Sequence, residues 1–235
     1  MLNFTIAKYT DMVVFYILQR ISLKDQVYDY LKKAIMNGEL VSGEIYSEQF
    51  FATNLNISRT PVREAILQLK QENLLEIYPS RGVMIKPMSF EELKKILQVR
   101  IAIEGYSAMY LARNIHKEDA QELLSNLEEY LNMEKDVKNR KEKAFEFMRA
   151  DVDFHFGIIN YTNNEYFVTT IQTLRSRIER VIFKSLQKDF RMGDAVNEHQ
   201  ELFECIKRGD EHGAFASFQQ HMQNTEELLS TINFD

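Results

Sequence analysis

The chain has 235 residues, of which 45% are hydrophobic and 27% charged, a composition typical of a globular protein with room for two modest domains. Its single cysteine excludes an internal disulfide framework and fits a reducing cytosol, so we expect a cytoplasmic protein. No apolar run reaches the roughly 20 residues that span a bilayer, which predicts no membrane partner, and the net charge of −6 argues against a general nucleic-acid binder.

The charge is unevenly distributed along the chain, which weakens the argument that a net charge of −6 makes against nucleic-acid binding. Residues 22–88 carry 8 basic and 8 acidic side chains, whereas residues 89–235 carry 19 basic and 26 acidic ones. The N-terminal part, residues 22–88, is called the head below. A neutral head joined to an acidic C-terminal part is compatible with DNA binding where the basic groups of the head are clustered. The 8 Gly and 3 Pro are few for this length, which favours a mostly helical fold.

The N-terminal part of the sequence predicts an extension followed by a small domain. We interpret residues 1–21 as an N-terminal extension rather than a signal peptide, because their apolar stretch is short and no small-residue cleavage site follows it. Helices are predicted over 22–37, 47–54 and 58–72, and a β-hairpin with strands 75–78 and 83–86 surrounds a Pro/Gly turn. This order is that of a winged helix-turn-helix, which we assign to residues 22–88.

The second helix of this motif begins with a basic cluster. Arg59 and Arg63 are four residues apart and share one helix face, with Thr60 beside them. A recognition helix meets base edges at its start, and an Arg there bonds guanine O6 and N7. Arg81 and Gly82 at the tip of the wing are placed to approach phosphate or the minor groove. Spacing alone leaves open that the arginines are merely solvated.

From Ser89 onward the pattern is helical throughout. Helices are predicted over six ranges: 90–113, 117–138, 142–161, 165–190, 194–207 and 211–232. We therefore expect an all-α antiparallel helical bundle over residues 89–235.

Polar side chains interrupt the apolar stripes of three of these helices. Asp151 and His155 share the inward face of helix 142–161, and His199 and His221 lie on the inward faces of the two last helices. Buried carboxylates and imidazoles are costly unless they are paired. They either form a hydrogen-bonded core network without metal, or hold a divalent cation such as Zn, Ni, Mn or Fe.

An inward arginine lies on the first helix of the bundle. Arg100 follows the stripe of Leu93 and Leu97, and Glu104 is one turn away. An arginine is always charged and needs a partner. That partner is either Glu104 or the carboxylate of a bound effector, and the sequence leaves the two at equal weight.

The head resembles the winged helix of the GntR family. The resemblance rests on Ser47-Glu48, on the run Ser58-Arg59-Thr60-Pro61-Val62-Arg63-Glu64-Ala65, and on Arg81-Gly82. It implies that Arg59, Thr60 and Arg63 contact operator bases or nearby phosphates and that the wing glycine approaches the minor groove. Many members have an Arg that contacts DNA where this chain has Gln49, so we do not include Gln49 among the DNA-binding residues.

The bundle resembles the FCD domain of the FadR-type branch of that family. The matching segments are Asp151 to His155, Glu198-His199-Gln200, Gln220-His221-Met222 and Ile206 to Asp210. The resemblance implies that Asp151, His155, His199 and His221 bind a metal ion. It also allows Arg100 to meet a small carboxylate effector. Six predicted helices point to the shorter, VanR-like version of the domain.

The resemblance implies a transcription regulator, a repressor that binds double-stranded operator DNA as a homodimer and is relieved by a small organic acid. We do not expect an enzyme, although a metal-dependent hydrolase or oxygenase using the four inward residues is the alternative. No separate nucleophile or general base is evident, and an enzyme would not explain the head. A metal that is purely structural, or is itself the signal, is a further alternative.

Overall fold

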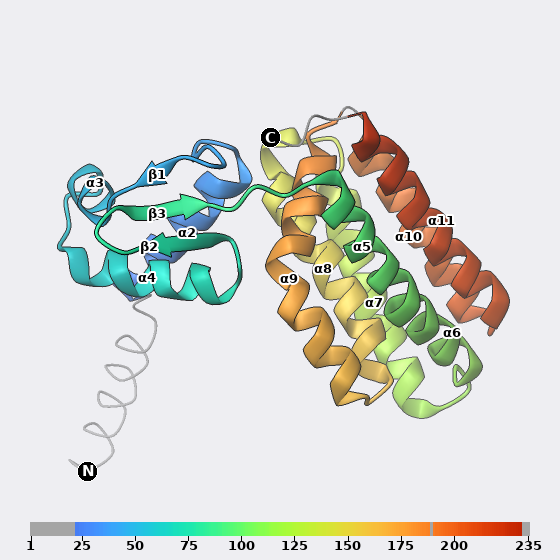
Figure 1. Ribbon diagram of the computed structural model, residues 1–235. Coiled ribbons are helices and arrows are strands. Elements are labelled where there is room, and N and C mark those ends of the chain that lie inside the picture. Colours follow the sequence, from blue (N-terminus) through green and yellow to red (C-terminus); the bar gives the residue numbers. More distant parts are fainter. Residues whose placement is uncertain (1–21, 189, 232–235) are drawn as a thin grey trace, which may run out of the picture. The chain divides into compact units, whose positions relative to one another are not determined.

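The computed structural model describes residues 22–188 and 190–231, so the N-terminal extension expected over residues 1–21 lies outside the described part. The chain divides after Lys86 into two compact units, each with its own buried core (Figure 1). Within these described ranges, no helix combines the length and the hydropathy that crossing a bilayer requires.

The described part of the first unit contains three helices, α2 (Leu23–Met36), α3 (Glu48–Asn54) and α4 (Arg59–Gln71). Serine side chains start two of them: Ser22 accepts a hydrogen bond from the amide of Asp25, and Ser47 accepts one from Phe50. The apolar stripes of α2 and α4 pack against each other. These helices agree with the predicted ones to within one or two residues at each end.

A three-stranded antiparallel sheet completes the first unit. Its strands are β1 (Ile45–Tyr46), β2 (Leu75–Tyr78) and β3 (Gly82–Ile85), in the order β1-β3-β2. The hairpin β2–β3 was predicted, and β1 was missed because two residues are too few to show an alternating pattern. The winged helix-turn-helix prediction is confirmed.

The second unit is helical throughout its described residues, as predicted. Its elements are α5 (Phe90–Arg100), the π-helical turn η1 (Ile101–Gly105), α6 (Tyr106–Arg113), α7 (Glu118–Val137), the 3-10 turn η2 (Lys141–Lys143), α8 (Ala144–Tyr161), α9 (Glu165–Leu186), α10 (Arg191–Lys207) and α11 (Glu211–Ser230). The predicted first helix, 90–113, runs continuously through α5, η1 and α6. Figure 1 shows these helices lying alongside one another.

One helix boundary was predicted wrongly. The sequence placed the break between the fourth and fifth helices at 191–193, whereas α9 ends at Leu186 and α10 begins at Arg191. Residues 187–190 contain neither Gly nor Pro, while Gly193 lies inside α10, so the usual markers misled the prediction. The correction matters because it places Arg191 on a helix and among buried residues.

The helices of the second unit surround a core of large apolar side chains. Phe147, Phe154 and Phe218 are fully buried there. Helix α8 packs against α7 and α9, and α11 packs against α10 and α6. This packing brings the inward faces of α8, α10 and α11 toward one point.

Candidate metal centre and DNA-reading face

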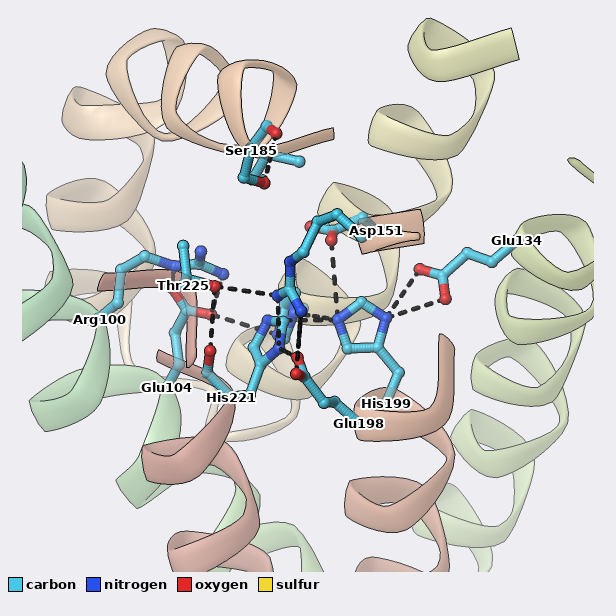
Figure 2. Close-up of polar contacts among 12 residues, drawn as sticks. Arg100, Glu104, Glu134, Asp151, Ser185, Glu198, His199, His221 and Thr225 are labelled. Atoms are coloured by element: carbon cyan, nitrogen blue, oxygen red, sulfur yellow. Dashed lines mark hydrogen bonds and ion pairs between the residues drawn. The ribbon is translucent and has the colours of Figure 1, made fainter. Parts of the chain in front are cut away.

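The four inward polar residues of the bundle meet in one cluster. Asp151 and His155 come from α8, His199 from α10 and His221 from α11, and each is at most 4% exposed. Each residue offers one ligand atom, and the four atoms lie within 4.8 Å of one another. Figure 2 shows Asp151, His199 and His221 converging from their separate helices.

The distances within this cluster suit a shared ion. The Nε2 atom of His199 lies 3.3 Å from Nε2 of His155, 3.3 Å from Nε2 of His221 and 3.6 Å from Oδ2 of Asp151. Two ligand atoms that are each about 2.1 Å from one ion lie roughly 3.0–3.4 Å apart. Oδ1 of Asp151 is buried and has no hydrogen-bond partner among the described residues. An unsatisfied buried carboxylate oxygen beside three imidazole nitrogens fits a divalent cation.

A carboxylate lies behind each imidazole, on the side away from the cluster centre. Nδ1 of His199 is 2.9 and 3.0 Å from the two oxygens of Glu134, and Nδ1 of His221 is 2.5 Å from Glu198 (Figure 2). Nδ1 of His155 is 3.4 Å from Glu104. Carboxylates in this position orient a metal-binding imidazole and make it a better ligand. Each ring therefore turns its Nε2 toward the common centre.

Two of these carboxylates were not identified from the sequence. Glu134 is fully buried on α7, in the apolar stripe that also contains Leu127 and Leu131, so its inward position was detectable as a departure from that stripe. Glu198 is 15% exposed and adjacent in sequence to His199, and helical periodicity gives no signal for it.

Burial and neighbouring charges govern protonation in the cluster. Burial lowers the pKa of His155 and of His221 well below the usual value, and nearby positive groups add to this effect, so both rings are neutral at pH 7. Burial also acts to lower the pKa of His199, but the Glu134 and Asp151 carboxylates together outweigh it and the net shift is upward. Neutral imidazoles are the form that binds metals.

Two buried guanidinium groups flank the cluster. Arg100 bonds Glu104 through Nε at 2.6 Å and Nη2 at 3.0 Å, so the sequence-predicted neighbour is its partner here. Arg191 bonds both oxygens of Glu198 at 2.9 Å and Thr225 at 3.0 Å. Arg191 was not predicted, because it lay in the expected break between helices.

Arg100 also borders a small cavity beside the cluster. The cavity measures about 10 Å³ and is lined by Arg100, Glu104 and His155 together with apolar side chains of α8 and α9. That volume holds about one water molecule. A larger ligand therefore requires the surrounding helices to move apart.

The basic residues predicted in the head lie on an exposed face. The side chains of Arg59 and Arg63 are 55% and 59% exposed, and neither is buried against the core. Both bond the carboxylate of Glu48, the first residue of α3, at distances of 2.9–3.3 Å. Thr60 is also exposed at the start of α4.

A groove of about 320 Å³ separates these arginines from the wing. One wall contains Glu48, Arg59 and Arg63, and the other is the hairpin from Ile77 to Val83, including Arg81 and Gly82. Thr60 is not among the lining residues. Four of the five residues predicted to contact DNA therefore face one groove, and Thr60 lies beside it on α4.

Gly82 has a structural reason to be glycine. Its φ of 130° is rare for other residues, and a Cβ atom at this position would collide with the backbone carbonyl of Tyr46 on β1. We expect Gly82→Ala to lower the free energy of unfolding by about 1–3 kcal/mol, measured by denaturant titration. Gly43→Ala is the matched control, because Gly43 also has a positive φ, of 83°, but has open space around it, so that variant introduces no collision. Equal losses in the two variants would contradict the predicted collision.

Comparison with known families accounts for both units. Residues 23–85 match the family model "Bacterial regulatory proteins, gntR family", and residues 95–224 match that of the FCD domain. The FCD match alone covers more than half of the chain.

Individual relatives are similar over nearly their whole length. The chain is 26% identical to the HTH-type transcriptional regulator YdhC of Bacillus subtilis, covering 88% of this chain and 91% of the relative. It is 24% identical to the HTH-type transcriptional repressor RspR of Escherichia coli, covering 89% and 90% respectively. Among solved structures, E. coli McbR/YncC superimposes with a TM-score of 0.69 at 22% identity, covering 91% of this chain and all of that one. This last likeness supports the fold.

Proposed function

Because this chain is a transcriptional regulator of the GntR family with an FCD domain, we propose that it is a repressor controlled by a small organic acid that binds beside a metal ion. The family assignment excludes the enzymatic alternative, since its domains and relatives are those of regulators. When α5, η1 and α6 are taken as one continuous helix and η2 is joined to α8, the described residues of the second unit form six helices, a number that supports the VanR-like version of the domain.

The observation that carries the metal proposal is the convergence of four buried ligand atoms. Asp151, His155, His199 and His221 are placed to hold the ion, with Zn, Ni, Mn or Fe as candidates. When bound, an octahedral ion of this kind would leave two positions for water or a ligand oxygen. Glu104, Glu134 and Glu198 would hold the three imidazoles in orientation.

We place the effector carboxylate between the metal and Arg100. Arg100 borders the small cavity beside His155, which supports its role, but its Nε and Nη2 groups are bonded to Glu104. An entering carboxylate would therefore share or replace Glu104 as the partner of Arg100. Because Glu104 also lies 3.4 Å from Nδ1 of His155 on α8, such an exchange would alter a contact between η1 and α8, which is a direct way for the ligand to change the bundle.

In the head, we propose that Arg59, Thr60, Arg63, Arg81 and Gly82 contact double-stranded operator DNA. Two copies in a homodimer would read an inverted repeat, as helix-turn-helix dimers do. The effector would then shift operator affinity by its preference for one of two states, commonly about 1–3 kcal/mol.

We expect Arg63→Ala to weaken specific DNA binding roughly 5- to 150-fold and to leave folding intact, because the arginine is exposed and one bidentate base contact is lost. The DNA is a duplex selected from a random pool by the wild-type protein, and random-sequence DNA is the competitor. Lys70→Ala removes the same charge from the other end of α4. Discrimination that is retained in Arg63→Ala, or lost equally in Lys70→Ala, would refute the assignment.

The proposed metal and effector site of the second unit is tested by elemental analysis combined with a thermal-shift screen of small carboxylates. A ligand at 100 times its dissociation constant stabilises the protein by about 2.7 kcal/mol, a readily measured shift. Operator affinity is then measured with metal alone and with metal plus the acid found. A response to metal alone would instead identify the metal as the signal.

A further inference from the structure

The two arginines at the start of α4 share one carboxylate that the proposed function does not use. Oε1 of Glu48 accepts a bond from Nε of Arg63 at 3.1 Å. Oε2 accepts bonds from Nη2 of Arg63 at 2.9 Å and from Nη2 of Arg59 at 3.0 Å. The side chain of Glu48 is 21% exposed, against more than half for each arginine. The acid therefore lies beneath the guanidinium groups, which remain on the surface.

These bonds leave both guanidinium groups able to contact bases. A guanidinium has five N–H donors, and a bidentate contact to guanine requires two of them. The bonds to Glu48 use two donors of Arg63 and one of Arg59. The carboxylate therefore restricts the orientation of each planar group and leaves the remaining donors pointing away from it.

The same bonds alter the charge of the reading face. Two arginines and one glutamate carry a net charge of +1 rather than +2. Bonding to Arg63, together with Arg59, lowers the pKa of Glu48, so the carboxylate is ionised at neutral pH. Each phosphate that a protein neutralises adds to sequence-independent affinity and to its salt dependence. An acid in this position opposes that component of binding.

We propose that Glu48 is a specificity-determining residue: its carboxylate holds Arg59 and Arg63 in the orientation that reads bases and keeps them from binding phosphates without regard to sequence. This inference rests on the proposed role of the two arginines. It assigns Glu48 a positioning role, distinct from a direct contact between its carboxylate and a cytosine amino group.

A purely structural role for Glu48 predicts a different outcome. Glu48 is the first residue of α3, where a negative charge stabilises the helix by interaction with its dipole. Loss of that effect would lower the stability of the head and leave its choice of DNA sequence unchanged. Measurements of binding and of unfolding on one set of variants separate these roles.

The test uses Glu48→Gln, which keeps the shape of the side chain and removes its charge. Asp29→Asn is the matched control, because Asp29 is an exposed acid of the same unit that lies on α2 rather than on α3 or α4. Affinity is measured for the wild-type-selected duplex and for random-sequence DNA across a range of salt concentrations. We expect the ratio of the two affinities to fall about tenfold or more in Glu48→Gln. Random-sequence affinity should rise and its salt slope should steepen by about one.

The control should keep the wild-type ratio, and thermal unfolding should show both variants folded. Repeating the selection with Glu48→Gln, Arg59→Ala and Arg63→Ala identifies the base pairs involved. If Glu48 positions the arginines, Glu48→Gln should relax the base preference at the same positions of the duplex as the two arginine variants do. An unchanged affinity ratio, or relaxation confined to one base pair that neither arginine variant affects, would overturn the proposal. Failure of the wild-type protein to enrich any sequence would instead overturn the proposed function.

Discussion

Replacing His199 by Ala is expected to abolish stoichiometric binding of a divalent metal. Its Nε2 atom lies within 3.6 Å of a ligand atom of each of the other three residues, so it is the most central of the four. Its removal leaves three ligands and also leaves Glu134 buried without its imidazole partner. Elemental analysis of the purified variant, supported by calorimetric titration with Zn²⁺ and Ni²⁺, measures the effect.

Two further variants make the metal prediction decisive. Asp151→Asn preserves the volume of the side chain and removes its charge, so it should weaken metal binding even if the His199 variant does not fold. His212→Ala removes an exposed imidazole at the start of α11 and should retain wild-type metal content. Full occupancy in both His199→Ala and Asp151→Asn would contradict the proposed ligand set.

Replacing Arg100 by Met is expected to lower the free energy of unfolding by about 3–5 kcal/mol. Arg100 and Glu104 are each 2% exposed and bonded at 2.6 and 3.0 Å, so the variant leaves a buried carboxylate without its cation. Denaturant titration of the metal-free protein measures the loss without a contribution from ligand binding.

A second substitution in the Arg100–Glu104 pair provides an internal control for this prediction. Adding Glu104→Gln to Arg100→Met removes the unpaired charge, so the double variant should recover part of the lost stability. Arg113→Met breaks a surface pair with Glu211 and should change stability little, because solvent screens both charges. If Arg100→Met is no more destabilising than Arg113→Met, the cost assigned to leaving Glu104 buried without its cation is wrong.

Periodicity in the sequence was sufficient to place the four inward polar residues and the helices, apart from the boundary between α9 and α10. Asp151, His155, His199 and His221 each occupy a position that continues an apolar stripe, and such positions face the core whatever the neighbouring helices are. The basic residues of the head were placed by the same local reasoning, since a helix start and a wing tip are exposed features of their motif.

The partners of these residues were decided by the tertiary structure. Glu134 of α7 meets His199 of α10, and Glu198 of α10 meets His221 of α11, only because these helices pack together. Arg191 of α10 reaches Thr225 of α11 in the same way, and no pattern within one helix encodes these contacts. Glu48 bonds arginines 11 and 15 residues away for the same reason. Local periodicity determines which way a side chain faces, whereas contacts between helices depend on how those helices pack, which the sequence of one element alone does not specify.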